Sequence, residues 1–577
     1  MNLVDYFQDD AIIRMLCKQR LKHAKKRHKI HLIRDVSLNP TTNRIATSQL
    51  CPSELAELFP SRRNWYRLKE KERKMYSNSQ KLQLVALERT IYLTKKNATQ
   101  GKSKPIWLIK LETFVEQIKA EIESGNIIFE KPEIFAIKKE DKKDTTSYRP
   151  ISNYSLRDRI IIGLTARYLT DFFDNLFQDC SLAFRSVKNK PVKTHHDAIE
   201  LICKYRGNRT KGNIYVAECD IKKFYDCVSH KMTLSVFNEL VSMQVANGKE
   251  FDKRAFNVFS AYLHSYSFKD DVYILNQDVQ YWKAKNILSG VFEWPEKEMR
   301  KMHGDRFESE RIGVPQGGAL SCLISNLLLH SVDLKVLEAN DGNLLYIRYC
   351  DDMILLHSSE RACHEALQRY KEQIELNLLS IHDPVQVKRY DSHFWKTKSK
   401  EPFLWSSPSE GGIPWLSFVG YQIRYDGLIR IRQKSIKKEL KKQKDETNTI
   451  LKAIQSSKDD LLVKFSRKSK RQQVFALENR LISMSVGRVK VFNYKEYLPS
   501  YCWTNGFKKV NRNRILIKQL RLLDRSREKQ IKRFLGKLMN LNKDADTPDD
   551  PKITSNFFGN PYSYNGLISS PIIKKKK

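Results

Sequence analysis

The sequence predicts an α/β fold in which a mixed core of strands and helices is flanked by basic helical extensions. Two observations support this prediction. Between residues 110 and 430, short apolar runs of strand length alternate with stretches of helical periodicity, as a mixed core requires. Outside that range, apolar residues recur at helical spacing among lysines and arginines. The basic helical stretches are 11–35, 434–456, 460–484 and 512–539.

The chain of 577 residues is long enough for several domains. We predict a basic N-terminal extension over 1–109, the α/β core over 110–430, a helical basic region over 431–541 and a loosely ordered tail over 542–577. The tail is rich in Pro, Asn, Ser and Gly, and such termini seldom become ordered unless other contacts hold them.

The charge balance indicates the kind of partner. Lys and Arg number 104 against 66 Asp and Glu, so the formal net charge is +38. A surplus of this size repels itself unless a polyanion neutralises it, and nucleic acid is the usual polyanion. The alternative is a basic protein whose charge serves solubility alone.

Signals for metal ligation by cysteine, for disulfides and for targeting are weak. The ten cysteines form no C-x-x-C pair, which disfavours zinc ribbons and disulfide frameworks. Cys17, His23, His28 and His31 could be imagined as a metal site, but they lie in a basic helical pattern that favours an ordinary helix. The sequence has neither a secretion-type leader nor about eighteen uninterrupted apolar residues. We therefore expect a cytoplasmic protein that does not span a membrane.

One of the Asp-Asp pairs has an unusual context. The pair occurs five times, but only Asp351-Asp352 stands between two apolar runs, 344–349 and 353–356. Two apolar strands joined at two carboxylates predict a hairpin whose tip presents both acids from a buried support. Buried carboxylates are costly unless a cation compensates them, and a divalent metal ion is the natural cation. The alternative is a solvated turn that happens to hold two aspartates.

A second acid stands in a similar frame. The apolar run 214–219 predicts a buried strand that ends at Asp220. A carboxylate at the end of a strand, beside the tip of a neighbouring hairpin, can share two Mg²⁺ ions with the acids of that tip. Such a pair of ions suits in-line phosphoryl transfer, because it can activate a 3′-hydroxyl and neutralise the leaving pyrophosphate.

A glycine-containing segment lies between these acids. Residues 313–321 read G-V-P-Q-G-G-A-L-S and lead into an apolar helix over 323–333. Glycines without side chains let a nucleotide or a template approach the backbone closely. The alternative is a plain loop before a helix.

Together these three segments resemble the polymerase domain of reverse transcriptases, in the order that the family uses. They are D-I-K-K-F-Y-D (220–226), V-P-Q-G-G-A-L-S (314–321) and Y-C-D-D (349–352). Further matches are Y-R-P-I-S (148–152), D-R-I-I (158–161), L-A-F-R-S (182–186), F-V-G-Y-Q-I (418–423) and G-L-I-R-I-R (427–432). The resemblance covers residues 110 to 540. It implies a right-hand polymerase with fingers and palm over 110–430 and an α-helical thumb over 431–541.

The resemblance implies an RNA-directed DNA polymerase, a nucleotidyltransferase that adds dNTPs. Asp220 and Asp351 would ligate two Mg²⁺ ions, for which Mn²⁺ is an alternative, with help from the Ile221 carbonyl and Asp352. Tyr225, five residues after Asp220, matches the ring that blocks a ribose 2′-hydroxyl.

Further residues match the family's nucleotide and primer contacts. Lys139 (or Lys138) and Arg149 match cations that hold the incoming triphosphate. Gln316 and Gly317 match the floor beneath the nucleotide. Gly420 and Tyr421 match the primer grip.

The sequence departs from the family at one position. The family usually places a lysine after the catalytic hairpin, where it can protonate the leaving pyrophosphate, but 376–388 has no lysine at the expected offset. His382, Lys388 or water are the alternatives, so the general acid stays unassigned.

The flanking regions resemble the group II intron-like bacterial branch, and within it the domesticated enzymes linked to phage defence. The resemblance implies an RNA template, a dedicated non-coding RNA and a DNA product, with a second protein subunit or a homo-oligomer left open. Group II intron-type or retron-type enzymes remain alternatives. So do a non-catalytic RNA-binding protein on the same fold, which would have lost an acid, and an RNA-dependent RNA polymerase, which Tyr225 and Y-C-D-D disfavour.

Overall fold

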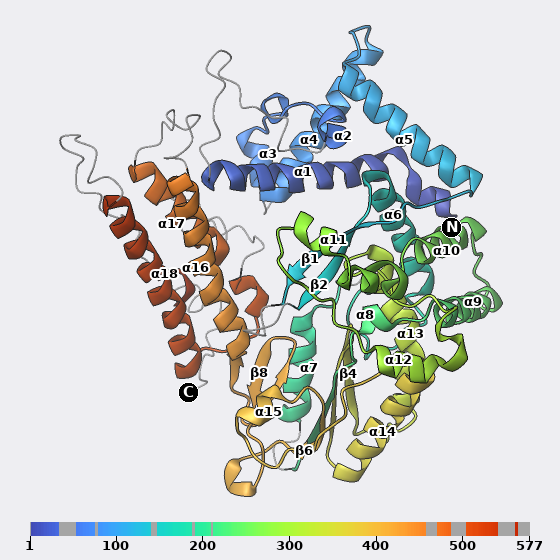
Figure 1. Cartoon of the computed structure of the whole chain (residues 1–577), viewed down its shortest axis with the longest axis vertical. Helices are drawn as coiled ribbons and strands as arrows, with labels where there is room; N and C mark the ends of the chain where they lie inside the picture. The colour runs from blue at the N-terminus through green and yellow to red at the C-terminus, as the bar shows by residue number, and fades with distance from the viewer. Residues whose placement is uncertain are drawn as a thin grey trace. The chain divides into compact units, whose positions relative to one another are not determined.

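A computed structural model shows the fold of the chain (Figure 1). It describes residues 2–33, 53–75, 79–139, 147–186, 191–208, 212–456, 470–485, 503–540 and 560–563. The chain divides into two compact units. Unit 1 comprises Met1–Ile12, Phe114–Val419 and Arg424–Gly427, and unit 2 comprises Ile13–Thr113, Gly420–Ile423 and Leu428–Lys577. Residues 1–12 thus group with the catalytic motifs, whereas the sequence predicted one extension through residue 109.

The centre of unit 1 is a four-stranded sheet with the strand order β4-β5-β3-β6. Its strands are β3 (Tyr215–Cys219), β4 (Leu345–Tyr349), β5 (Asp352–His357) and β6 (Lys400–Leu404). Every neighbouring pair is antiparallel. The strand before Asp220 and the hairpin around Asp351-Asp352 are therefore confirmed.

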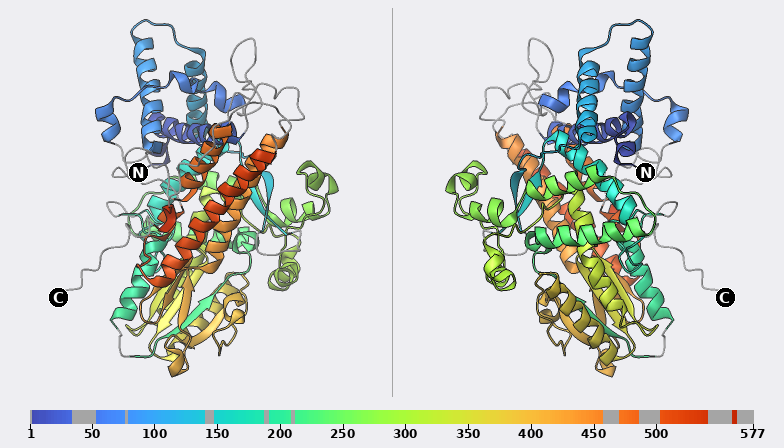
Figure 2. Two further views of the ribbon diagram at one scale, coloured as in Figure 1. Left: turned by 90° about the vertical axis from the view of Figure 1, so that its left-hand side faces the viewer. Right: turned by 90° about the vertical axis from the view of Figure 1, so that its right-hand side faces the viewer.

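Helices cover this sheet (Figure 2). α14 (Glu360–Leu376) packs on β3, β5 and β6, and α13 (Ala319–Leu337) packs on α14, α6 (Leu156–Phe173) and α9 (His230–Ala246). By length and composition α13 is apolar enough to cross a membrane, but 72% of its apolar window is buried inside the protein. That burial is typical of a core helix, because α13 buries its apolar surface against its neighbours.

The fingers side of unit 1 is a two-stranded antiparallel hairpin of β1 (Glu133–Lys138) and β2 (Tyr148–Asn153). A long segment over 268–310, which we call the insert, shares an aromatic core with β1. Tyr266, Phe268, Trp282 and Phe292 are buried in that core together with Ile134. The insert contains η3 (Phe268–Val272), η4 (Tyr273–Asn276), α11 (Val279–Ala284), α12 (Glu296–His303) and η5 (Gly304–Phe307).

Shorter elements complete unit 1. They are η1 (Leu3–Phe7), α7 (His195–Gly207), α8 (Phe224–Cys227), α10 (Lys253–His264), α15 (Ser392–Lys396), η6 (Pro408–Glu410) and β7 (Trp415–Phe418). α5 (Ile106–Ser124) ends in unit 1, and Gly125 follows it with φ +68°.

Unit 2 contains the N-terminal arm and the C-terminal helices. The arm holds most of α1 (Asp9–Ile33), then α2 (Ser53–Glu57), η2 (Arg62–Asn64), α3 (Glu70–Lys74) and α4 (Ser79–Thr99). The C-terminal part holds β8 (Tyr421–Arg424), β9 (Ile429–Ile431), α16 (Gln433–Ser456), α17 (Lys470–Ser485), η8 (Thr504–Phe507) and α18 (Arg514–Asn540). α16, α17 and α18 pack together around Leu477, Leu481 and Phe534. The predicted helical character is confirmed for these helices, and residues 460–469 of the predicted helix 460–484 lie outside the described residues.

Residues 560–563, within the predicted loose tail, are held by buried contacts. Tyr562 is fully buried in unit 2, its hydroxyl donates to Glu439 Oε1 at 2.7 Å, and its backbone N–H donates to Asp524 Oδ1 at 2.9 Å. Ser563 donates to the same aspartate at 2.7 Å. The expectation of a loose tail is therefore wrong for 560–563, because buried polar partners hold it, and the rest of 542–577 lies outside the described residues.

The two units differ in charge. Counted along the sequence, acidic and basic residues in the ranges of unit 1 balance to within a few charges. The ranges of unit 2 therefore carry the whole surplus of +38.

Candidate active site

The catalytic turn is a two-residue connection between β4 and β5. Tyr349 pairs with Asp352, so Cys350 and Asp351 form the tip. Cys350 has a φ of +61°. This left-handed conformation is strained for a non-glycine residue and persists only where surrounding contacts hold it. Asp351 is partly buried and Asp352 is exposed, so the turn presents both acids from a buried sheet, as predicted.

A buried ion pair supports this turn from below. Arg348 and Asp333 are both completely buried, and the guanidinium donates to both carboxylate oxygens at 2.8 and 2.6 Å. The Tyr346 hydroxyl also donates to Asp333, at 2.8 Å, and Arg348 Nη1 donates to the Cys350 carbonyl at 3.1 Å. The strained residue of the catalytic turn is thus tied to a closed network. Sequence reasoning missed this network.

Asp220 lies at the neighbouring strand end. It follows Cys219, which pairs with Met353 of β5, so the strand register brings Asp220 to the end of the sheet that carries the catalytic turn. Burial, together with the charge of Asp220, raises the pKa of Asp351, whereas the charges of Arg149 and Arg348 act in the opposite direction. The two carboxylates predicted to share metal ions are therefore close enough to repel each other.

A lysine and a histidine flank Asp220. Lys398 Nζ lies 3.0 Å from Asp220 Oδ2, and His382 Nε2 lies 3.7 Å from the same oxygen. Burial and the nearby Lys398 lower the pKa of His382, although Asp220 opposes the shift. His382 therefore does reach the site, but Lys398, which sequence reasoning did not consider, is the lysine that contacts Asp220. Lys388 is exposed, and no described contact joins it to the acids.

The donor set fits a divalent cation. Lys222 N–H donates to Ser380 and His382 N–H donates to the Asp220 carbonyl, at 2.7 and 2.9 Å, so this bridge leaves the Ile221 carbonyl on its opposite side. The Asp220 and Asp351 carboxylates, which repel each other, and the Ile221 carbonyl, which faces away from this bridge, are hard oxygen donors of the kind that Mg²⁺ prefers. Within the described ranges, no three His, Cys, Asp or Glu side chains form a ready-made metal cluster. Mg²⁺ does not require one, because it commonly uses one or two carboxylates and takes its other ligands from water and substrate phosphates.

Tyr225 lies beside the catalytic turn. Its backbone carbonyl accepts a hydrogen bond from Val314 N–H at 2.7 Å, which joins the first acid motif to the P-Q-G segment. Burial and the nearby charge of Asp351 raise the pKa of Tyr225, so the hydroxyl stays protonated. The ring is thus held close to the acids, where the resemblance requires a sugar-sensing side chain.

Gln316 and Gly317 lie next to a buried carboxylate that sequence reasoning left without a role. Gln316 Nε2 donates to Asp226 Oδ1 at 2.6 Å, and Asp226 is only 1% exposed. Burial raises the pKa of Asp226 to about 6, although Lys223, Gln316, Lys139 and Arg149 lower it. Gly317 has a φ of +92° and open space where a Cβ would stand, so its backbone can be approached closely.

The predicted triphosphate cations come from the β1-β2 hairpin. Arg149 pairs with Ile137 across the hairpin, is exposed, and acts by its charge on Asp226 and Asp351. Lys139 is half-buried and Lys138 is exposed. Lys139 and Lys223 both approach Glu293 Oε2, at 3.2 and 3.8 Å. Burial and repulsion by Lys139 lower the pKa of Lys223 to about 8.

The predicted primer grip falls in unit 2. Gly420 has a φ of +91°, a conformation that favours glycine. Tyr421 is completely buried, its hydroxyl donates to the Gly506 carbonyl at 3.2 Å, and its ring packs edge-on against Phe507. The side chain of Tyr421 therefore anchors this loop, and any primer contact here falls to the backbone of the loop. The primer-grip role stays a prediction.

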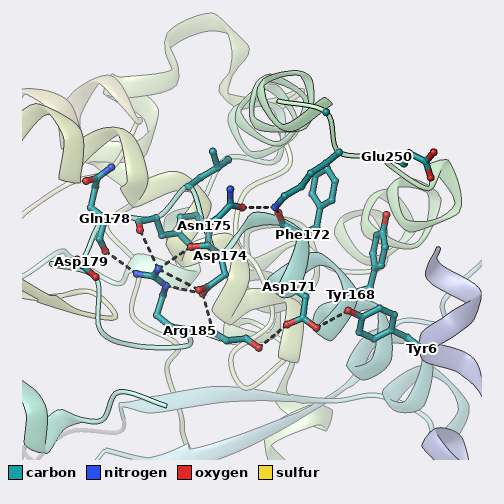
Figure 3. A pocket seen from close by; sticks show the side chains of 15 residues that line it. Tyr6, Tyr168, Asp171, Phe172, Asp174, Asn175, Gln178, Asp179, Arg185 and Glu250 are labelled. Atoms are coloured by element: carbon teal, nitrogen blue, oxygen red, sulfur yellow. Dashed lines mark hydrogen bonds and ion pairs between the residues drawn. The ribbon is translucent and has the colours of Figure 1, made fainter. Parts of the chain in front are cut away.

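The L-A-F-R-S motif has a structural role (Figure 3). Arg185 donates to the Asp174 carboxylate at 2.8 Å and to the carbonyls of Gln178 and Ser181 at 2.8 and 3.0 Å. It thereby fixes the loop that pairs with β4 through Ser181 and Arg348. The neighbouring pocket, of about 880 Å³, is also lined by Tyr6 and Asp171, which hydrogen-bond at 2.6 Å.

Comparison with known proteins identifies the core. Residues 137–383 match the family model "Reverse transcriptase (RNA-dependent DNA polymerase)". Among solved structures, the chain is similar to telomerase from Candida albicans in complex with a fragment of telomeric RNA, at 11% identity and a TM-score of 0.31, covering 77% of this chain and 70% of that one. It is also similar to apo telomerase from Candida tropicalis, at 13% identity and a TM-score of 0.30, covering 73% and 68%. No curated protein sequence matches the chain. The assignment rests on the family match.

Proposed function

Because residues 137–383 form a reverse transcriptase domain, which makes the protein an RNA-directed DNA polymerase, we propose that it copies a dedicated non-coding RNA into DNA in antiviral defence. The observation that supports the polymerase site best is the approach of Asp220 to Asp351 at one end of the sheet, where the charge of one raises the pKa of the other. Two carboxylates so placed repel each other until cations neutralise them.

The reaction that fits this site is addition of a dNTP to a 3′-hydroxyl. Two Mg²⁺ ions, held by Asp220, Asp351 and Asp352 with the Ile221 carbonyl, would supply Lewis-acid activation and charge neutralisation when bound. The protein itself positions the reactants. The closed network around Arg348 holds the catalytic turn, Tyr225 shapes the sugar site, and Lys139 and Arg149 offer positive charge to the triphosphate.

Primer extension tests the polymerase function. The purified full-length chain, an RNA template with a DNA primer, Mg²⁺ and dNTPs should yield alkali-resistant product, and Asp220→Asn should yield none. A wild-type protein that extends no primer, on RNA or on DNA, with Mg²⁺ or Mn²⁺, would leave the acids without this role.

For RNA binding, the proposal draws on the charge of unit 2. The basic helices after Arg432 and most of the arm before residue 110 fall in this unit, which carries the whole positive surplus. α16 alone exposes Lys437, Lys438, Lys441 and Lys442. Charges spread over helices can follow an RNA backbone by shape and phosphate contacts.

Crosslinking and sequencing in cells test the dedicated RNA. A single dominant RNA should be protected at defined positions, and changing these four lysines together to glutamine should weaken that protection. Recovery of cellular RNAs in proportion to their abundance would instead indicate a template-indifferent polymerase. Both kinds of binding weaken as salt rises, so affinity alone does not separate them.

The proposed defence role rests on resemblance to domesticated bacterial enzymes. Expression in a phage-sensitive bacterium should reduce plaque formation, and Asp351→Asn should restore it. Equal plaque numbers for the two proteins across a panel of phages would argue for another pathway.

A further inference from the structure

One carboxylate of the insert, Glu293, lies between two lysines near the predicted triphosphate site. Glu293 Oε2 lies 3.2 Å from Lys139 Nζ and 3.8 Å from Lys223 Nζ. Lys139 directly follows β1, Lys223 belongs to the first acid motif, and Glu293 lies 154 residues after Lys139 in the chain. The carboxylate side chain is 34% exposed, so a solute can reach it.

The insert fixes the position of Glu293. The next residue, Trp294, donates its indole N–H to the Asp226 carbonyl at 2.9 Å, and its ring packs against Phe268. The preceding residue, Phe292, is completely buried, and its N–H donates to Asn276 Oδ1 at 2.7 Å. With both neighbours anchored, the Glu293 backbone is held beside the first acid motif whether or not the lysines are paired.

The three cations nearby match the charge of a triphosphate better than that of one carboxylate. Lys139, Lys223 and Arg149 all act on Asp226 through their charges. Glu293 and Asp226 together carry at most two negative charges, whereas a nucleotide triphosphate brings several negative charges and many acceptor oxygens. A half-exposed ion pair is also weak, so exchanging it for a ligand costs little.

We propose that Glu293 is a resident counter-ion of the triphosphate site, which holds Lys139 and Lys223 between turnovers and is displaced by the incoming triphosphate. This proposal rests on the proposed function in taking Lys139 as a triphosphate ligand, and it adds Lys223 to that set. Glu293 is a positioning residue, because it acts through the lysines. Its presence weakens triphosphate binding, since the ligand must compete with it.

Equilibrium binding of inorganic tripolyphosphate to the full-length protein tests the proposal without requiring catalysis. Glu293→Gln should bind it about two- to fivefold more tightly than the wild type, because the competing charge is gone. Glu296→Gln is the matched control. Glu296 is also an insert acid, but it accepts from the Tyr273 hydroxyl at 2.8 Å and pairs with Arg300, so its binding should equal the wild type.

A second variant keeps the test independent of how Glu293→Gln folds. Lys223→Gln should weaken tripolyphosphate binding, and adding Glu293→Gln to it should give a smaller gain than in the wild type. Unchanged or weaker binding by a folded Glu293→Gln protein would overturn the proposal, and so would unchanged binding by Lys223→Gln. If the binding results hold but no protein extends a primer, the polymerase proposal fails while the anion site stands.

Discussion

Two buried aspartates of unit 1 are compensated in different ways. Asp333 accepts two hydrogen bonds from the Arg348 guanidinium and is completely buried with it. Asp226 is almost as buried, but it accepts a hydrogen bond from the Gln316 amide, and no described lysine or arginine forms an ion pair with it. The charges of Lys223 and Arg149 still act on it. The first arrangement is a closed support for the catalytic turn. The second borders a set of half-exposed cations, as a surface that accepts a charged ligand would.

The difference suggests that the catalytic unit separates support from binding. A fully paired buried charge keeps one arrangement, because breaking the pair leaves an uncompensated charge. Half-exposed pairs such as Lys139 with Glu293 contribute little to stability and can exchange partners.

The largest expected effect concerns Asp351, the acid at the tip of the catalytic turn. Asp351→Asn keeps the shape of the side chain and removes the charge that would bind metal ions. We expect DNA synthesis to fall by at least about 10³-fold, which corresponds to roughly 4 kcal/mol of transition-state stabilisation. Single-nucleotide incorporation by the purified variant measures this.

RNA binding is the control for that variant. Unit 2 carries the positive surplus and is unchanged, so Asp351→Asn should retain the RNA affinity of the wild type. Incorporation at the wild-type rate would show that Asp351 is not a metal ligand.

Breaking the closed network should have the largest effect on stability. Asp333→Asn leaves the Arg348 guanidinium buried without a carboxylate, and loss of one partner of a buried pair costs about 3–5 kcal/mol. Thermal unfolding should show a much lower midpoint. Activity should fall with it, because Arg348 also holds the Cys350 carbonyl.

Glu338→Gln is the matched control, because Glu338 follows the same helix, α13, and pairs with Lys335 and Arg369 at a side chain that is 53% exposed. Its unfolding midpoint should stay close to that of the wild type. Equal midpoints for Asp333→Asn and Glu338→Gln would refute the distinction between closed and open pairs.

The sequence predicted the catalytic framework and not its supports, for a physical reason. Asp220 and Asp351 stand at the ends of apolar strands, so the local pattern alone predicts where their carboxylates lie. Arg348 and Asp333 carried a usable signal, since each is a charge inside or at the end of an apolar run. Lys398 carried none, because its contact with Asp220 depends on how distant strands pair.

The nucleotide side was predicted by family resemblance alone. The sequence shows Lys139 and Arg149 beside a hairpin, but it does not show that Glu293, 154 residues away, reaches Lys139. Nor does it show that Tyr421 is completely buried. Such contacts follow from tertiary packing, which periodicity does not encode.

A smaller effect is expected at the sugar site. Tyr225 is held beside the catalytic turn through its backbone bond to Val314. Tyr225→Ala should weaken discrimination against rNTPs by roughly ten- to a hundredfold, because the pocket loses the ring that would collide with a 2′-hydroxyl. The ratio of kcat/KM values for a dNTP and its rNTP measures this. Tyr225→Phe keeps the ring and should keep the ratio, whereas a ratio unchanged in Tyr225→Ala would place the sugar selection elsewhere.

The smallest effect sharpens the comparison of the two aspartates through pH. The pKa of Asp226 is raised by burial from 3.8 to about 6, so the folded state binds this proton more tightly than the unfolded state. Stability contributed by that proton is present below about pH 4 and is lost as the pH rises through 6. Asp226→Asn cannot lose a proton, so it should be more stable than the wild type at pH 8 by roughly 1–3 kcal/mol and no more stable at pH 4.

Unfolding midpoints at pH 4, 6 and 8 measure this difference, and Asp270→Asn, the same change at a carboxylate that is 38% exposed, should show no such trend. Asp226→Asn could instead be the less stable protein at pH 8. Lys223 and Arg149 would then compensate Asp226 as fully as Arg348 compensates Asp333, and the two buried aspartates would not differ.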